Sequence, residues 1–116
     1  MSLDQELHDF LKSIYDSKYD FEVRVSDRKT SRRLGTYFKL KRKIVLYPKL
    51  IKRSKNDLKA IAIHEYAHHL HFTEFQSPED KDPHGPHFWR IYSALMSKAT
   101  MMGIYSDPYI ATIFKD

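Results

Sequence analysis

The chain has 116 residues, contains no cysteine and carries a formal net charge of +5 at pH 7. A chain of this length can build one modest core, so we predict one domain over residues 1–116, and the missing cysteine excludes disulfides and thiolate metal sites. It shows neither a signal peptide nor the roughly 18–20 consecutive apolar residues that a membrane helix needs, so we expect a cytoplasmic protein with no membrane contact.

The first part of the chain predicts one helix followed by short strands. Apolar residues recur at helical spacing over residues 3–15, which indicates an amphipathic helix. Residues 19–25 then alternate apolar and polar side chains, as a half-buried strand does. Two further β-rich runs, 34–40 and 43–47, are joined by charged residues and predict a hairpin that Pro48 closes.

Two longer helices are predicted in the second half of the chain. Ser54 or Asn56 can cap the first helix, which should run to about His71. A polar loop over residues 73–85 separates it from a helix that Pro86 is suited to begin and that a glycine at position 103 can end. We therefore predict an α+β fold, in which a small, mainly antiparallel sheet of about three strands packs on the first of these helices.

The stretch IAIHEYAHHLHF, residues 61–72, places four histidines and one glutamate in an otherwise apolar segment. On a helix, His64 and His68 project from one face about a turn apart, so two imidazole nitrogens can reach one Zn²⁺ at roughly 2.0–2.1 Å. Glu65 follows the first of them, where a carboxylate can approach water on the metal without binding the metal itself. The pattern H-E-x-x-H therefore predicts a hydrolytic zinc site, and the alternative is a helix that is merely rich in histidine.

A catalytic zinc takes a third protein ligand besides water. His84 is the strongest candidate because it directly precedes the helix that we expect to begin at Pro86, and Gly85 permits the tight turn between them. His87, on the first turn of that helix, is the second candidate. Glu79 is the third, and it stands in a loop with no helix to aim it.

Other side chains near the motif suit the metal less well. His69 lies about 100° around the helix from His68 and should point elsewhere. His71 shares the face of His64 but lies a further turn along, so we expect it at the rim of the site. Glu74 stands where one class of zinc peptidases keeps its third histidine, but His71 replaces the glycine that lets the chain turn there.

The ordered motifs LGTYFKLKRKIVLYPKL, IAIHEYAHHLHF and HGPHF resemble the SprT-like zinc metallopeptidase domain over roughly residues 30–100. The resemblance implies a compact zincin-like fold. It also implies that the zinc ligands are His64, His68 and His84 and that the catalytic base is Glu65. Phe88 would be a core residue behind the third ligand. Some members of the family act on proteins bound or crosslinked to DNA. Because this chain has no cysteine, the zinc ribbon that often follows the domain is not expected in it.

The site predicts a zinc-dependent metallopeptidase in which Glu65 takes a proton from the attacking water and delivers it to the leaving amine. His71, His87 or Tyr66 could add a hydrogen-bond donor for the oxyanion. One arm of the 34–47 hairpin would pair with the polypeptide substrate. Two alternatives stay open: a structural zinc in a nucleic-acid-binding module, with His87 as a fourth ligand, and an amidohydrolase of small substrates.

Positive charge is concentrated in the middle of the chain. Residues 24–59 hold about fourteen Lys and Arg side chains against two Asp, a net charge of roughly +12. This segment predicts either non-specific DNA binding or an ordinary solvated surface. Because strand residues alternate between faces, we expect Lys39, Lys41 and Lys43 to share one side of the hairpin.

Overall fold

The computed structural model describes residues 2–28, 33–48, 54–76 and 82–106, and every structural statement below refers to these residues. The elements in chain order are α1 (Leu3–Ile14), β1 (Glu22–Val25), β2 (Gly35–Phe38), β3 (Lys43–Leu46), α2 (Lys55–Thr73) and α3 (Pro86–Met101). Their order and type agree with the sequence predictions, and the α+β class is confirmed.

The sheet has the strand order β1-β3-β2 and is mixed rather than mainly antiparallel. β2 and β3 form the expected antiparallel hairpin, with Tyr37 opposite Ile44. β1, however, pairs with β3 in parallel, with Val23 opposite Ile44. β1 lies beside β3 and not beside β2, its neighbour in the sequence. This arrangement leaves β2 at one edge of the three-stranded sheet.

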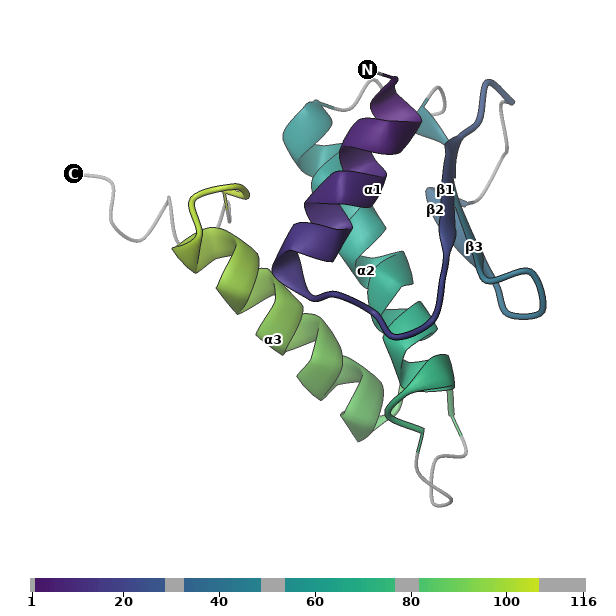
Figure 1. Cartoon of the computed structure of the whole chain (residues 1–116), viewed down its shortest axis with the longest axis vertical. Coiled ribbons are helices and arrows are strands. Elements are labelled where there is room, and N and C mark those ends of the chain that lie inside the picture. Colours follow the sequence, from purple (N-terminus) through teal and green to yellow (C-terminus); the bar gives the residue numbers. More distant parts are fainter. Residues whose placement is uncertain (1, 29–32, 49–53, 77–81, 107–116) are drawn as a thin grey trace.

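The helices lie on one face of the sheet (Figure 1). α1 contacts β1, whereas α2 contacts both β2 and β3, and α3 packs against α2 and α1 on the side away from the sheet. No helix in the described ranges covers the opposite face of the sheet. In the same ranges, no helix has both the length and the apolar character needed to cross a membrane.

The core lies between the sheet and the helices. Its buried apolar side chains come from every element except β2. Those with essentially no exposure are Leu7, Leu11, Ile14, Ile44, Leu46, Ala62, Ile63, Tyr66, Ala67, Phe88 and Ala99. Because α2 supplies the middle of this core, its position is fixed by packing on both sides, against the sheet and against α3.

The turn of the hairpin separates the three lysines that were expected on one side. β2 ends at Phe38 and β3 begins at Lys43, so the turn between them does not keep the alternation of a strand. The ammonium nitrogen of Lys39 lies 5.6 Å from the ring centre of Phe72 on α2, whereas Lys41 and Lys43 line a cavity on the uncovered face. The expectation that Lys39 lies with the other two is therefore wrong.

Candidate metal centre and its cleft

The local sequence fixes α2 at its N-terminus. The Ser54 hydroxyl accepts a hydrogen bond from the backbone N–H of Asp57, and the Asp57 carboxylate accepts one from the backbone N–H of Ser54. This capping box satisfies donors that the first turn of a helix leaves unpaired. The helix then continues through Thr73 and carries His64 and His68 on the face that lines a cleft.

A short turn before α3 fixes His84. The carboxylate of Asp82 accepts a hydrogen bond of 2.9 Å from the backbone N–H of His84, and the carbonyl of Asp82 accepts one of 3.0 Å from Gly85. Gly85 is the N-cap of α3, and Pro86 occupies the first helical position. Proline is favoured there because its missing N–H needs no partner. His84 thus stands at a fixed element end, as predicted.

The structure brings His64, His68 and His84 into one group that could hold a metal ion. One ligand atom from each lies within 4.8 Å of the others, and the Nε2 atoms of His68 and His84 are 3.0 Å apart. Two nitrogens bound to one tetrahedral Zn²⁺ at about 2.0–2.1 Å lie roughly 3.4 Å apart. This pair needs to open only slightly, and the other separations, which are no longer than 4.8 Å, need to close toward the same value. Three imidazoles are a donor set that suits zinc.

Phe88 lies behind the three imidazoles and fixes their positions. Its ring stacks on that of His68 with centres 4.3 Å apart, and its centre is 5.0 Å from those of His64 and His84. Phe88 is fully buried, which confirms the predicted core role. A packed aromatic ring leaves the histidine rings few alternative orientations, so the group is largely preformed.

Burial and neighbouring charge keep the imidazoles of His64 and His68 neutral. Burial, reinforced by the neighbouring histidines, lowers the pKa of His68 to about 3, and burial followed by the charge of His84 lowers the pKa of His64. A neutral imidazole has a lone pair available for a metal, whereas an imidazolium has none. At neutral pH, these two side chains are therefore in the form that a metal requires.

Glu65 lies in the same cleft, between α2 and the edge strand β2. Only 7% of its surface is exposed, and burial raises its pKa to about 7, while the charge of Arg33 acts in the opposite direction. Gly35 of β2 makes this close approach possible, because a Cβ atom there would lie 3.2 Å from a Glu65 carboxylate oxygen and 2.8 Å from Ile61. The glycine therefore lets the edge strand pass directly beside the carboxylate.

The cleft has a volume of about 510 Å³ and follows β2 along its length. Its described lining comes from β2 and its flanks, from α2, and from the turn before α3. These residues are Arg33, Gly35, Thr36, Tyr37, Lys39, His64, Glu65, His68, His71, Phe72, Gln76, Asp82, Pro83 and His84. The candidate metal ligands and the candidate base thus share one groove with an edge strand.

His69 points away from the cleft, as predicted, and forms a buried hydrogen-bond chain. The Tyr37 hydroxyl donates to His69 Nδ1 at 2.7 Å, while Nε2 lies 3.2 Å from the carbonyl oxygen of Tyr19 and 2.9 Å from the Ser17 hydroxyl. A carbonyl can only accept, so the proton of His69 resides on Nε2. The chain ties the edge strand β2 to α2 next to the candidate ligand His68.

Glu74 is the far end of this chain and not a metal ligand. Its carboxylate accepts hydrogen bonds from the hydroxyls of Tyr15 and Ser17 and from the backbone N–H of Lys18, at 2.8, 3.1 and 2.9 Å. Three donors from the segment after α1 thus hold that segment against the C-terminus of α2. This geometry agrees with the expectation that Glu74 is not a metal ligand.

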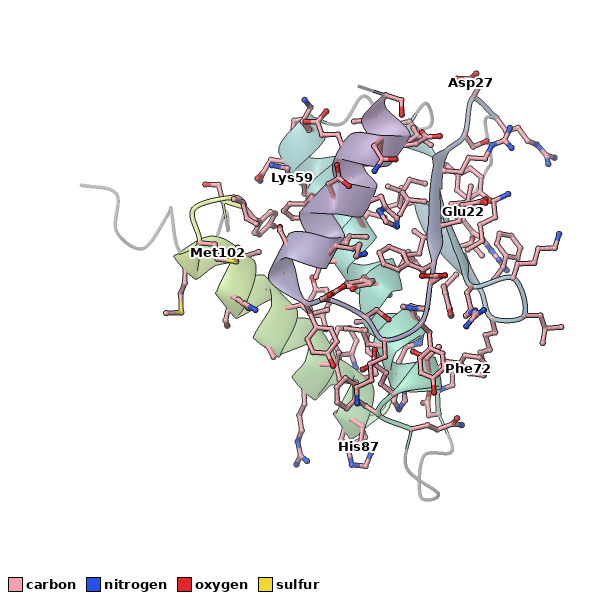
Figure 2. The ribbon with its side chains drawn as sticks, viewed as in Figure 1. Glu22, Asp27, Lys59, Phe72, His87 and Met102 are labelled. Atoms are coloured by element: carbon pink, nitrogen blue, oxygen red, sulfur yellow. The ribbon has the colours of Figure 1, made fainter. Side chains whose placement is uncertain are left out.

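The other candidate ligands and oxyanion donors differ in their position relative to the cleft. His71 is buried and lines the cleft. His87 is outside the group of three histidines and is not among the described residues that line the cleft; it projects from the first turn of α3 at the lower edge of Figure 2. The hydroxyl of Tyr66 donates to the carbonyl of Tyr15 within the core, so Tyr66 is not an oxyanion donor. Glu79 lies outside the described residues.

Two residues at the site were not found from the sequence. Arg33 lies close enough to Glu65 to lower its pKa, and Tyr37 holds His69. A weak signal points to Arg33, because it belongs to a long basic run. No signal points to Tyr37, because its partner His69 lies far away in the chain.

No curated protein and no solved structure matches this chain significantly. A family model does match the chain: the SprT-like family matches residues 4–107. This range includes all the helices and strands described above, except for the first residue of α1. This range contains the three histidines, Glu65 and the edge strand. The chain therefore belongs to the SprT-like family.

Proposed function

We propose that the protein is a zinc-dependent metallopeptidase. The observation that carries this proposal is the meeting of three imidazoles and a buried glutamate in one cleft beside an edge strand. Membership of the SprT-like family supports it. His64, His68 and His84 would hold the metal, and Glu65 would be the general base.

The chemistry assigns a separate task to each part of the site. Zinc, when bound, would lower the pKa of a water molecule and polarise the carbonyl of the substrate. Glu65 would accept the proton of the attacking water and return it to the leaving nitrogen, for which a carboxyl with a raised pKa is well matched. Phe88 and the turn at Asp82 would keep the three imidazoles in place during the reaction.

The edge strand favours a polypeptide over a small amide as the substrate. The backbone N–H of Tyr47 donates to the carbonyl of Leu34, which marks these residues as a hydrogen-bonded pair of the β2–β3 ladder. Hydrogen-bonded and non-hydrogen-bonded pairs alternate along an antiparallel ladder, so Gly35 and Tyr37 belong to non-hydrogen-bonded pairs. Their backbone N–H and C=O groups therefore point away from β3. An extended polypeptide could pair with these groups along the cleft.

The ligand group favours a catalytic over a structural zinc. A structural site is closed by four protein ligands, whereas a catalytic one keeps a position for water. The group in the described part of the chain contains three histidines, and His87 is not one of them. The fourth position would face the cleft, where Glu65 lies.

The Glu65→Gln variant tests the proposed chemistry. It keeps the size and hydrogen bonding of the side chain but removes the base, so the zinc-loaded variant should hydrolyse an unfolded protein at least about 100-fold more slowly while retaining its metal. Glu74→Gln is the matched control, because it changes the acid at the C-cap of the same helix, which does not line the cleft. Equal activity of the wild type and Glu65→Gln would refute the role of Glu65.

We further propose that the uncovered face of the sheet binds DNA without sequence preference. Arg24, Arg28, Lys41 and Lys43 line a cavity of about 410 Å³ there, together with the aromatic rings of Phe38 and Tyr47. Cations can neutralise phosphates, and exposed aromatic rings can stack on bases. Asp27 also lines this cavity, and Lys43 forms an ion pair with Glu22 at 3.4 Å, so we expect modest affinity.

A further inference from the structure

Both ends of the catalytic cleft carry positive charge that the proposed mechanism does not use. Arg33 precedes β2 and Lys39 follows it, and both line the cleft. The acidic side chains in its described lining are Glu65, which is the proposed base, and Asp82. The carboxylate of Asp82 accepts the backbone N–H of His84, which offsets part of its charge. The described groove should therefore attract negative charge.

Lys39 is held over the cleft by an aromatic side chain. Its ammonium nitrogen lies 5.6 Å from the ring centre of Phe72, within the range of a cation–π contact. Phe72 is 38% exposed and lies on α2 one turn beyond His68, on the side that faces the hairpin in Figure 2. His71, next to it in the sequence, also lines the cleft. An ammonium group above a flat ring offers a site for a side chain with a carboxylate.

The position of Lys39 relative to Glu65 indicates which substrate residue would meet it. Gly35 lies beside Glu65, and Lys39 follows four residues later, in the turn directly after β2, at most about 13 Å away along the chain. A substrate that pairs antiparallel with β2 directs its N-terminal part toward Lys39. The residue near Lys39 would thus lie three or four positions before the cleaved bond.

We propose that Lys39 and Phe72 form a specificity subsite that selects an acidic side chain three or four residues N-terminal to the cleaved peptide bond. This inference rests on the proposed peptidase function and on pairing of the substrate with β2. Lys39 acts on substrate selection and takes no part in bond cleavage. The substrate class is therefore acidic, extended polypeptide segments.

Quenched fluorescent peptides that differ at one position test this subsite. The zinc-loaded protein should cleave a peptide with Glu three or four residues before the bond about three to ten times more efficiently, by kcat/KM, than the same peptide with Lys. The Gln peptide should fall between them, and the ratio should shrink in high salt, since exposed charges are screened. The difference should appear mainly in KM.

Lys39→Glu should reverse the order of the Glu and Lys peptides. Arg42→Glu is the matched control, because it makes the same charge change in the same turn but its guanidinium lies over Tyr19, 5.9 Å from the ring centre. This control should keep the wild-type order. If the wild type cleaves all peptides equally, or if both variants reverse the order, the subsite proposal is wrong. If the wild type cleaves none of them, the proposed peptidase function itself fails.

Discussion

Gly35 is the residue whose replacement should disturb the site most specifically without touching a catalytic group. In Gly35→Ala, the new Cβ would lie 2.8 Å from Cγ2 of Ile61, 3.1 Å from Cγ of Glu65 and 3.2 Å from its carboxylate oxygen. Carbon atoms in ordinary contact are at least about 3.5 Å apart, so the strand must shift by about 0.7 Å to clear Ile61, or Ile61 by about 0.7 Å and Glu65 by about 0.4 Å. The general base and the edge strand would therefore separate.

The size of both effects can be worked out from this overlap. Overpacking of this kind costs about 1–3 kcal/mol of unfolding free energy, which lowers the melting temperature of a chain of this size by roughly 5–15 °C. A displacement approaching 1 Å of a catalytic group reduces the rate by up to about 100-fold. We expect a fall in kcat of the folded, zinc-loaded variant of roughly 10-fold to 100-fold, measured well below its melting temperature.

Gly103→Ala separates stability from activity. Gly103 has a φ of +73°, and a Cβ there would have no atom within 4 Å, so alanine strains the backbone without disturbing the cleft. This control should lower the melting temperature, at a cost of about 1 kcal/mol, and keep kcat. An unchanged kcat in Gly35→Ala, with Glu65 in its original position, would refute the claim that the glycine sets the distance between β2 and the base.

Three further predictions concern other parts of the chain. His84→Ala should lose most of its bound zinc and His87→Ala should keep it, as measured by metal analysis after dialysis; the reverse result would show that the third ligand is wrong. Burial raises the pKa of Glu74, but its hydrogen bonds lower the pKa by a larger amount, so the pKa of the folded state lies below its ordinary value. The carboxylate therefore contributes stability above about pH 4.3, and this stability is lost as the pH falls through the lowered pKa. Glu74→Gln should therefore be about 0.5–1 kcal/mol less stable at pH 7. This deficit, measured by urea unfolding, should shrink as the pH falls through the lowered pKa of Glu74, whereas a deficit that stays constant in acid would contradict this. DNA affinity should fall with salt at a log–log slope of about −3.5 to −4.5, and Lys41→Glu should flatten that slope by about one unit while Arg42→Glu leaves it unchanged; equal effects would indicate net charge alone.

The histidine group could be predicted because its information is local. His64 and His68 are four residues apart on a strongly predicted helix, and His84 is fixed by the turn signals Gly85 and Pro86 that immediately follow it. Each of these features depends on the geometry of a single helix or a single turn. The meeting of the two segments then followed from the need of zinc for a third ligand.

The pairing of the strands and the buried polar chain could not be predicted in this way. β1 pairs with β3, about twenty residues away, because the core selects this partner, and no turn residue encodes it. His69 likewise meets Ser17 and Tyr37 only because packing brings three distant segments together. The prediction that Lys39 shares one side with Lys41 and Lys43 was wrong, because the alternation of a strand stops where the turn begins.

The most direct test of the central claim is a crystal structure of the zinc-loaded protein. We predict one zinc ion bound by imidazole nitrogens of His64, His68 and His84, with a water molecule as the fourth ligand on the side of Glu65. A fourth protein ligand, such as His87, would make the site structural and contradict the peptidase proposal. A zinc ion bound elsewhere, with the three histidines free of metal, would contradict the assignment of the site itself.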